Sequence, residues 1–261
     1  MESWQDQGIV LSVRRHGENG AIVNLLTEMQ GRAAGYVRGA QGSKMRGTLE
    51  VGNLVDVRWQ SRTSDGLGSF SLELSKNTTA HFMQDALRLS ALQSACALCD
   101  EALPEREKHE GLFHGMLALF EQLEGDIWGV AYVLWEIALL KELGFSLDLT
   151  ACAGGGDSGA LAYVSPKTGK AVSADAGQPY KDKLLPLASF LKPAGSQGAG
   201  AMEPPDIYDG FLMTGYFLEH WVFAHHSRGV PASRLLFAER FAKTLDEQAL
   251  PAMKEDEYVT G

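Results

Sequence analysis

Two spacings of apolar residues divide this chain near residue 78. In the first part, short runs alternate apolar and polar side chains, as in residues 8–16, where Ile9, Leu11 and Val13 alternate with more polar neighbours. This two-residue period is typical of half-buried β-strands. From residue 80 onward, apolar residues recur every three or four positions, which is typical of helices. The pattern therefore predicts a strand-rich part followed by a helical part.

The strand-rich part holds five runs of this kind, separated by glycine-containing turns. They cover residues 8–16, 21–28, 32–39, 53–62 and 67–75. Short antiparallel strands in such a small part favour a closed barrel over a sandwich, because closure removes exposed strand edges. We therefore predict a five-stranded OB-fold barrel within residues 1–78.

The rest of the chain predicts an α-helical domain over residues 79–247, so the fold class is α+β with more than one domain. The expected helices cover residues 80–103, 110–124, 127–143, 206–227 and 231–247. Residues 150–183 interrupt the helical pattern with glycine-rich and strand-like segments, which predict a small inserted loop or hairpin module. Residues 192–205 are rich in Gly, Ala and Pro and predict a mobile loop. Residues 248–261 are expected to form a flexible tail.

Charge is distributed unevenly between the two parts. Residues 1–80 hold 9 Lys and Arg against 8 Asp and Glu, whereas residues 81–261 hold 14 against 25. Within residues 14–62 the balance is 8 basic to 4 acidic side chains. A basic, strand-rich module in an acidic chain suggests that one end of the protein binds a polyanion such as nucleic acid.

Alternation along the strands assigns candidate contacts to faces. It places Arg32, Tyr36 and Arg38 on one face of the third strand, where guanidinium groups can neutralise phosphates and the aromatic ring can stack on a base. In the fourth strand Arg58 and Arg62 share a face, and Trp59 belongs to the opposite, core-facing side. The loop over residues 40–47 is expected to be flexible and cationic at the barrel mouth. The predicted DNA-binding residues are Arg14, Arg15, Arg32, Tyr36, Arg38, Lys44, Arg46, Arg58 and Arg62.

Other signals limit the alternatives. The first seven residues lack the basic region of a signal peptide, and the longest apolar stretch, 127–140, is shorter than the ~20 residues that span a bilayer. Three cysteines indicate a reducing compartment, so we expect a cytoplasmic protein that binds no membrane. Cys96 and Cys99 have zinc-like spacing but lie in a helical apolar pattern that favours core packing. No motif predicts an enzyme, a cofactor or a metal.

The order of segments resembles the RecO family of recombination mediator proteins. The resemblance is carried by GIVLSVRRHGENGAIVNLLTEMQGRAAGYVRGAQGSKMRG, GNLVDVRW, AYVLWEIALLKELGFSLDLTACA and LAYVSPKTGKAVS, and it covers about residues 5–190. It implies an OB-fold, a helical domain and no catalysis. It also implies binding of single- and double-stranded DNA, strand annealing in the nucleoid, and action with RecR, and often RecF, to load RecA on DNA coated by single-strand binding protein, whose tail the helical domain contacts.

One family feature is missing from the sequence. Many members carry a four-cysteine zinc site in the inserted module, in two C-x₂-C pairs. Here Cys152 remains, Gly155 stands where its partner would be, and residues 171–174 read AVSA in place of the second pair. We therefore predict no zinc.

Three other functions remain open from the residues. An OB-fold can bind RNA as well as DNA, because it contacts the backbone of either polymer. The barrel could instead bind only proteins and serve as an interaction module without annealing activity. A hydrolase or transferase that uses the glycine loop from Cys152 to Asp157 is the third alternative.

Overall fold

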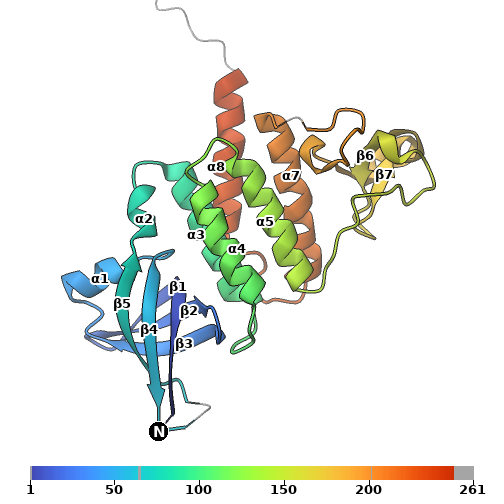
Figure 1. Ribbon diagram of the computed structural model, residues 1–261. Coiled ribbons are helices and arrows are strands. Elements are labelled where there is room, and N and C mark those ends of the chain that lie inside the picture. Colours follow the sequence, from blue (N-terminus) through green and yellow to red (C-terminus); the bar gives the residue numbers. More distant parts are fainter. Residues whose placement is uncertain (1, 64–65, 201, 250–261) are drawn as a thin grey trace, which may run out of the picture.

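The computed structural model describes residues 2–63, 66–200 and 202–249, and it contains a closed five-stranded barrel followed by helices (Figure 1). The strands follow one another around the barrel in the order β1-β2-β3-β5-β4. This arrangement confirms the predicted OB-like barrel and the α+β class. The strands are β1 (Glu2–His16), β2 (Gly20–Thr27), β3 (Gly31–Arg38), β4 (Leu54–Ser61) and β5 (Ser69–Lys76).

Strand β1 is longer than its hydrophobic pattern predicts. Its first half, from Glu2 to Ile9, pairs with β4, and its second half pairs with β2. The register shifts between Val10 and Ser12, and such a bulge bends a strand so that it can close a barrel. The alternation indicates a start at residue 8 because the preceding residues are mostly polar.

A short helix closes one end of the barrel. Helix α1 (Ser43–Thr48) lies where the sequence predicts a flexible loop, so that expectation is wrong for most of residues 40–47. Met45 and Leu49 pack against the barrel core one helical turn apart, and this burial stabilises the helix despite Gly47. The core that it covers includes Val10, Val23, Leu25, Val37, Val55, Val57, Trp59 and Phe70.

The helical domain agrees with the predicted segments, with two differences. The segment expected as one helix over 80–103 forms two helices, because Asp85 accepts hydrogen bonds from the Leu87 and Arg88 amides and begins a new helix. The segment expected over 206–227 ends in a π-helical turn, Leu218–Val222. The helices are α2 (Thr78–His81), α3 (Ala86–Ala102), α4 (Glu110–Gln122), α5 (Trp128–Glu142), α7 (Pro204–Phe217) and α8 (Ala232–Ala249). Within the described residues, no helix has the length and apolar character needed to cross a membrane.

The inserted module contains a small antiparallel sheet in the order β7-β6-β8. Its strands are β6 (Leu161–Val164), β7 (Ala171–Ser173) and β8 (Leu185–Pro186), and the short helix α6 (Ala174–Gly177) follows β7. The segment predicted as a mobile loop consists of turns over residues 192–200, with hydrogen bonds from the Gln197 amide to Gly159 and from the Gly200 amide to Ser189. Of the predicted tail, residues 250–261 lie outside the described part of the chain.

Helix α3 joins the barrel to the helical domain through a shared apolar core. Ile9, Leu11 and Leu26 of the barrel belong to the same buried cluster as Cys96 and Cys99 of α3. Both cysteines are completely buried, which agrees with a packing role. The barrel is thus docked on α3 by its outer surface, while a separate core fills its interior.

A buried ion pair links three helices inside the domain. Arg234 of α8 donates from Nε and Nη2 to the carboxylate of Glu136 in α5, at 2.5 and 3.0 Å. The Thr214 hydroxyl of α7 donates to the same carboxylate, and Arg234 also donates to the Phe211 carbonyl. The two charged side chains are 3% and 0% exposed, so each charge depends on the other for compensation.

We expect loss of this arginine to destabilise the protein strongly. Arg234→Met leaves the Glu136 carboxylate buried without its partner and should cost about 3–5 kcal/mol of unfolding free energy. The double variant Arg234→Met/Glu136→Leu removes both charges and should recover most of that loss. Urea unfolding of the four members of the cycle measures both values, and a double variant no more stable than Arg234→Met would contradict the expectation.

Candidate nucleic-acid interface

The β1–β2 hairpin and the end of β3 bring several predicted contacts together on the barrel exterior. Arg14 pairs with Ile22, which pairs with Tyr36, so the side chains of Arg14 and Tyr36 lie in one row across three strands. Arg38 lies one row further along, opposite Gly20. Arg14 and Arg38 are exposed, and Tyr36 is half-buried. Of the two arginines predicted to flank Tyr36, only Arg38 lies at this end of β3, and Arg14 of β1 lies in the row of Tyr36.

Gly20 makes room for the Tyr36 ring. A Cβ atom on Gly20 would lie 2.2 Å from the Tyr36 hydroxyl, so the ring rests directly on the β2 backbone. The His16 ring meets Tyr36 edge to face, with 6.1 Å between centroids. These contacts hold the ring against the barrel exterior beside the arginines.

Further cations extend this surface. Arg15 is exposed near the end of β1, and Lys44 and Arg46 are exposed on α1, which begins five residues after Arg38. We call this set the hairpin-end surface; it consists of Arg14, Arg15, Tyr36, Arg38, Lys44 and Arg46. Six of the nine predicted contacts thus lie at this end of the barrel, whereas Arg32, Arg58 and Arg62 do not.

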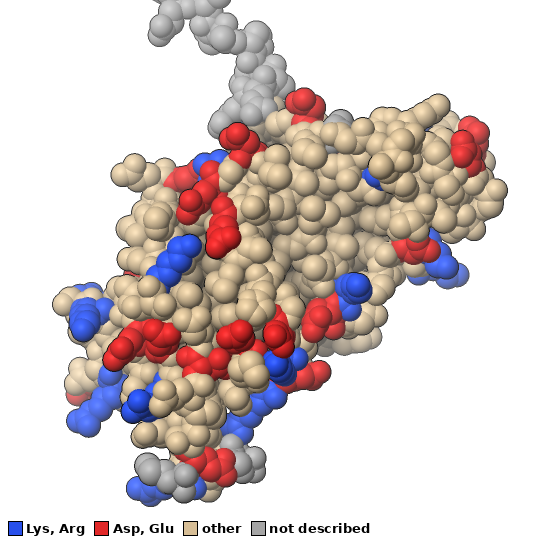
Figure 2. Space-filling view, in the orientation of Figure 1, with Lys and Arg blue, Asp and Glu red and all other residues tan. Residues whose placement is uncertain are grey.

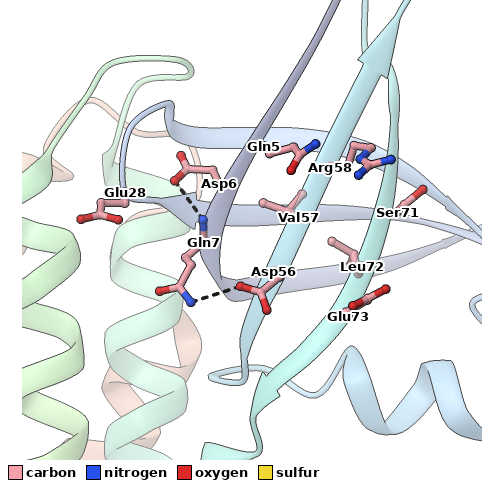
Figure 3. A pocket seen from close by; sticks show the side chains of 10 residues that line it. All are labelled: Gln5, Asp6, Gln7, Glu28, Asp56, Val57, Arg58, Ser71, Leu72 and Glu73. Atoms are coloured by element: carbon pink, nitrogen blue, oxygen red, sulfur yellow. Dashed lines mark hydrogen bonds between the residues drawn. The ribbon is translucent and has the colours of Figure 1, made fainter.

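Arg58 lies in different surroundings, on the face formed by β1, β4 and β5. It lines a cavity of about 650 Å³ together with Asp56 and Glu73, and Figure 3 shows these side chains beside the glutamines of β1. The cavity is also lined by Gln5, Asp6, Gln7, Glu28, Val57, Ser71 and Leu72. The cavity is thus lined by four carboxylates and one guanidinium, and this negative balance disfavours a phosphate, so Arg58 is a weaker candidate for a phosphate contact than the exposed arginines of the hairpin-end surface. Arg62 is exposed beyond the end of β4, away from the hairpin-end surface.

Acidic side chains form a band that crosses the β4–β5 face of the barrel and continues to the adjoining end of the helices. Figure 2 shows Lys and Arg on both sides of this band over the barrel, whereas much of the visible helical face carries no charged side chain. On this face of the molecule, acidic and basic side chains therefore both lie on the barrel.

Arg32 contacts the helical domain and does not belong to the hairpin-end surface. Its Nε donates to the Leu103 carbonyl at 2.8 Å, and its terminal nitrogens lie 3.7 Å from carboxylate oxygens of Asp100 and Glu105. Its side chain is 16% exposed. The prediction placed it correctly on the outer face of β3, but α3 and the segment after it cover that end of the strand. Arg32 therefore holds the barrel and the helical domain together.

Other contacts at this boundary tie the segment after α3 to the barrel. Gly31, the first residue of β3, has a φ of +67°, and a Cβ there would overlap the Glu107 carbonyl. The Arg106 amide donates to the Arg32 carbonyl at 2.8 Å, and Asn24 donates to Asp100. Arg106 was not predicted as a site residue, because no local pattern marks a loop residue that reaches a distant strand.

The inserted module does not fit a zinc ion. Cys152 and Ser173 face each other, with 3.4 Å between sulfur and hydroxyl oxygen, and Gly155 offers no side chain. Within the described residues, no group of three or more His, Cys, Asp or Glu side chains is placed to hold a metal. One thiol and one hydroxyl cannot supply the four ligands of a structural zinc site.

Hydrogen bonds make Cys152 unusual among the cysteines. Burial acts to raise the pKa of its thiol, but hydrogen bonds from the Ser173 hydroxyl and from the Ser173, Gly154 and Gly156 amides outweigh burial and lower the pKa to about 7. By contrast, burial raises the pKa of Cys96 and Cys99.

The barrel and the helices together define an OB-fold protein with a fused helical domain. Residues 1–77 match the family model described as recombination protein O N terminal, and residues 83–228 match the model for its C terminal. The chain is 50% identical to the DNA repair protein RecO of Rhodospirillum centenum, over 92% of this chain and 95% of that protein. It is 45% identical to DNA repair protein RecO of Caulobacter vibrioides, over 92% of this chain and 98% of that protein. The chain belongs to the RecO family of DNA repair proteins.

We expect Arg32→Ala to weaken the barrel-to-helix contact. The change removes a charged hydrogen bond to Leu103 and a neighbour of Asp100, and it should cost about 1–3 kcal/mol of unfolding free energy. Arg38→Ala is the matched control on the same strand face and should stay within about 0.5 kcal/mol, because Arg38 is exposed. Urea unfolding compares the two variants. Equal unfolding midpoints would show that Arg32 does not stabilise the contact between the barrel and the helical domain.

We expect Cys152 to be the reactive thiol of the folded protein. Alkylation by iodoacetamide should accelerate with a midpoint near pH 7, because the thiolate is the reactive form. Ser173→Ala removes one hydrogen bond to the sulfur and should move the midpoint upward. Cys152→Ser should abolish fast labelling, and labelling that persists in this variant would show that another cysteine reacts.

Proposed function

We propose that this protein binds single- and double-stranded DNA through the hairpin-end surface and anneals complementary strands. The observation that carries the proposal is the exposed set of cations around Tyr36 at one end of an OB-fold barrel, in a member of a DNA repair family. Lysine and arginine side chains bind phosphates and release counterions, and this binding does not depend on sequence. An aromatic ring beside them can stack on an unpaired base.

Annealing needs no bond chemistry on this surface. Two complementary strands repel each other through their phosphates, and a cationic surface reduces that repulsion while base edges stay available for pairing. The protein therefore acts as a mediator and not as an enzyme, and the reaction requires no cofactor.

The helical domain is proposed to bind protein partners. Its net negative charge disfavours DNA, and Ile127, Leu134 and Leu212 are exposed apolar side chains on or beside α5 and α7. Figure 2 shows a broad area without charged side chains over this part of the domain. We propose that the protein acts in the cytoplasm with RecR, and in some settings RecF. Together they would load RecA onto DNA coated by single-strand binding protein, whose tail contacts the helical domain.

Charge reversal on the hairpin-end surface should weaken DNA binding without destabilising the fold, because the reversed side chains are exposed. Arg14→Glu/Arg38→Glu should lower affinity for a 20-nucleotide single strand at least about tenfold and should slow annealing. The slope of log affinity against log salt should fall by about 1.4, because each single-strand phosphate contact contributes about 0.7. Fluorescence anisotropy over a salt series and an annealing assay with bare and protein-coated strands measure these effects.

The matched control is Lys181→Glu/Lys183→Glu, two exposed lysines of the inserted module with the same change in net charge. It should leave both assays nearly unchanged. Equal effects of the two double variants would show that net charge alone acts, and absence of DNA binding in the unmodified protein would refute the proposal. Stronger binding to an RNA of the same sequence would favour the RNA-binding alternative.

A further inference from the structure

The end of the barrel opposite α1 contains a small cavity. Its volume is about 170 Å³, and aromatic, small and polar side chains line it: Glu2, Trp4, Gln30, Ala33, Ala34, Trp59 and Arg106. None of these seven residues was among the predicted DNA contacts, and Trp59 was predicted to face the core. The cavity lies where β1 begins and β4 ends, so it is separate from the hairpin-end surface.

The stacked rings of Trp4 and Trp59 line this cavity, and Phe70 packs against Trp4 without lining it. The rings of Trp4 and Trp59 are nearly parallel, with 5.7 Å between centroids, and Phe70 meets Trp4 edge to face at 6.0 Å. Trp59 is 4% exposed, and its indole N–H donates to the Leu67 carbonyl, so it is part of the core. Trp4 is half-buried, and its remaining surface contributes to the cavity. The buried rings hold Trp4 in a fixed orientation.

The opposite wall is open because strand β3 carries only small side chains at this point. Ala33 and Ala34 line the cavity, and Gly35 follows them. A larger side chain at these positions would reduce the space in front of Trp4. The cavity therefore results from residue size on β3 and not from a missing element.

The helical domain places a cation at the rim. Arg106 has a φ of +61°, which is uncommon for a residue other than glycine and is maintained only where surrounding contacts require it. Its guanidinium donates to the Gly66 carbonyl at 2.8 Å and lies 5.7 Å from the centre of the Trp59 ring. Arg62 is exposed on the same β4–β5 loop side. Positive charge is thus present beside an aromatic wall.

We propose that this cavity binds one unstacked nucleobase of a DNA strand against Trp4. A base has a flat face that stacks on an indole whatever its identity, and its flanking phosphates are attracted by Arg106 and Arg62. Glu2 and Gln30 can form hydrogen bonds with polar groups at the base edge. At roughly 30 Å³ per water molecule, the cavity has the volume of about six waters, which suits one base and not two.

This inference rests on the proposed DNA binding, and it makes a different prediction from the hairpin-end surface. Bases in a duplex are paired and stacked, so a one-base cavity favours single strands only. Trp4→Leu should lower the affinity for a 20-nucleotide single strand about five- to hundredfold, the range for loss of one base–aromatic stack. Affinity for the matching duplex should stay within about twofold. Trp4→Phe keeps a ring and should retain most of the single-strand affinity.

A second variant tests the cavity without changing the rings. Ala34→Leu fills the space from a half-buried position on β3 and should reproduce the single-strand loss. Single strands should also quench tryptophan emission in the unmodified protein but much less in Trp4→Leu. Anisotropy, emission and urea unfolding are measured on the full chain for each variant.

The outcomes distinguish the two proposals. If the unmodified protein binds neither single strand nor duplex, the proposed function fails. If it binds both and Trp4→Leu and Ala34→Leu leave the single-strand to duplex ratio unchanged, DNA binding stands and the base cavity is refuted; a partner's aromatic side chain would then be the occupant to examine. If these two variants lose affinity equally for the single strand and the duplex, the base cavity is also refuted.

Discussion

The contact between the barrel and α3 constrains the rest of the structure. Ile9, Leu11 and Leu26 pack in the core shared with α3, and the Arg32 guanidinium reaches the Leu103 carbonyl at its edge. This docking covers one part of the barrel exterior and leaves the hairpin end, the β4–β5 face and the Trp4 end accessible. It also fixes the segment after α3 along β3, so that Arg106 reaches the barrel opening. The packing of the barrel on α3 therefore determines which surfaces of the barrel remain accessible.

The acidic band gives the accessible surfaces different properties. Carboxylates around Arg58 and along the boundary with the helices oppose a phosphate backbone, whereas the hairpin-end surface attracts it. Such effects act over about 8 Å at physiological salt, a distance shorter than the protein itself. Repulsion at the band and attraction at the hairpin end thus act locally. In the proposed function, they would keep the DNA backbone off the β4–β5 face and leave the outer helices accessible to protein partners.

Periodicity predicts the elements of this fold well, because burial on one side repeats every two residues in strands and every three or four in helices. It fails where burial does not dominate, as in the polar first half of β1 and in the glycine-containing α1. The same alternation predicts on which face of a strand a side chain lies, but it does not predict which residues from other elements contact that side chain. Arg32 and Arg38 share a face of β3, yet α3 covers one and leaves the other exposed. The cavity at Trp4 requires three distant segments, and no local pattern reveals it.

Two kinds of contact at opposite ends of one barrel are compatible with annealing. A surface that held many bases would compete with pairing, whereas phosphate contacts leave the bases available. A single stacked base is worth about 1–3 kcal/mol, and each step of a growing duplex gains about 1.4 kcal/mol on average. A few base pairs would therefore suffice to withdraw a base that is bound to Trp4 as proposed. Such a cavity would order the path of a single strand and release it once pairing begins, which a mediator of annealing requires.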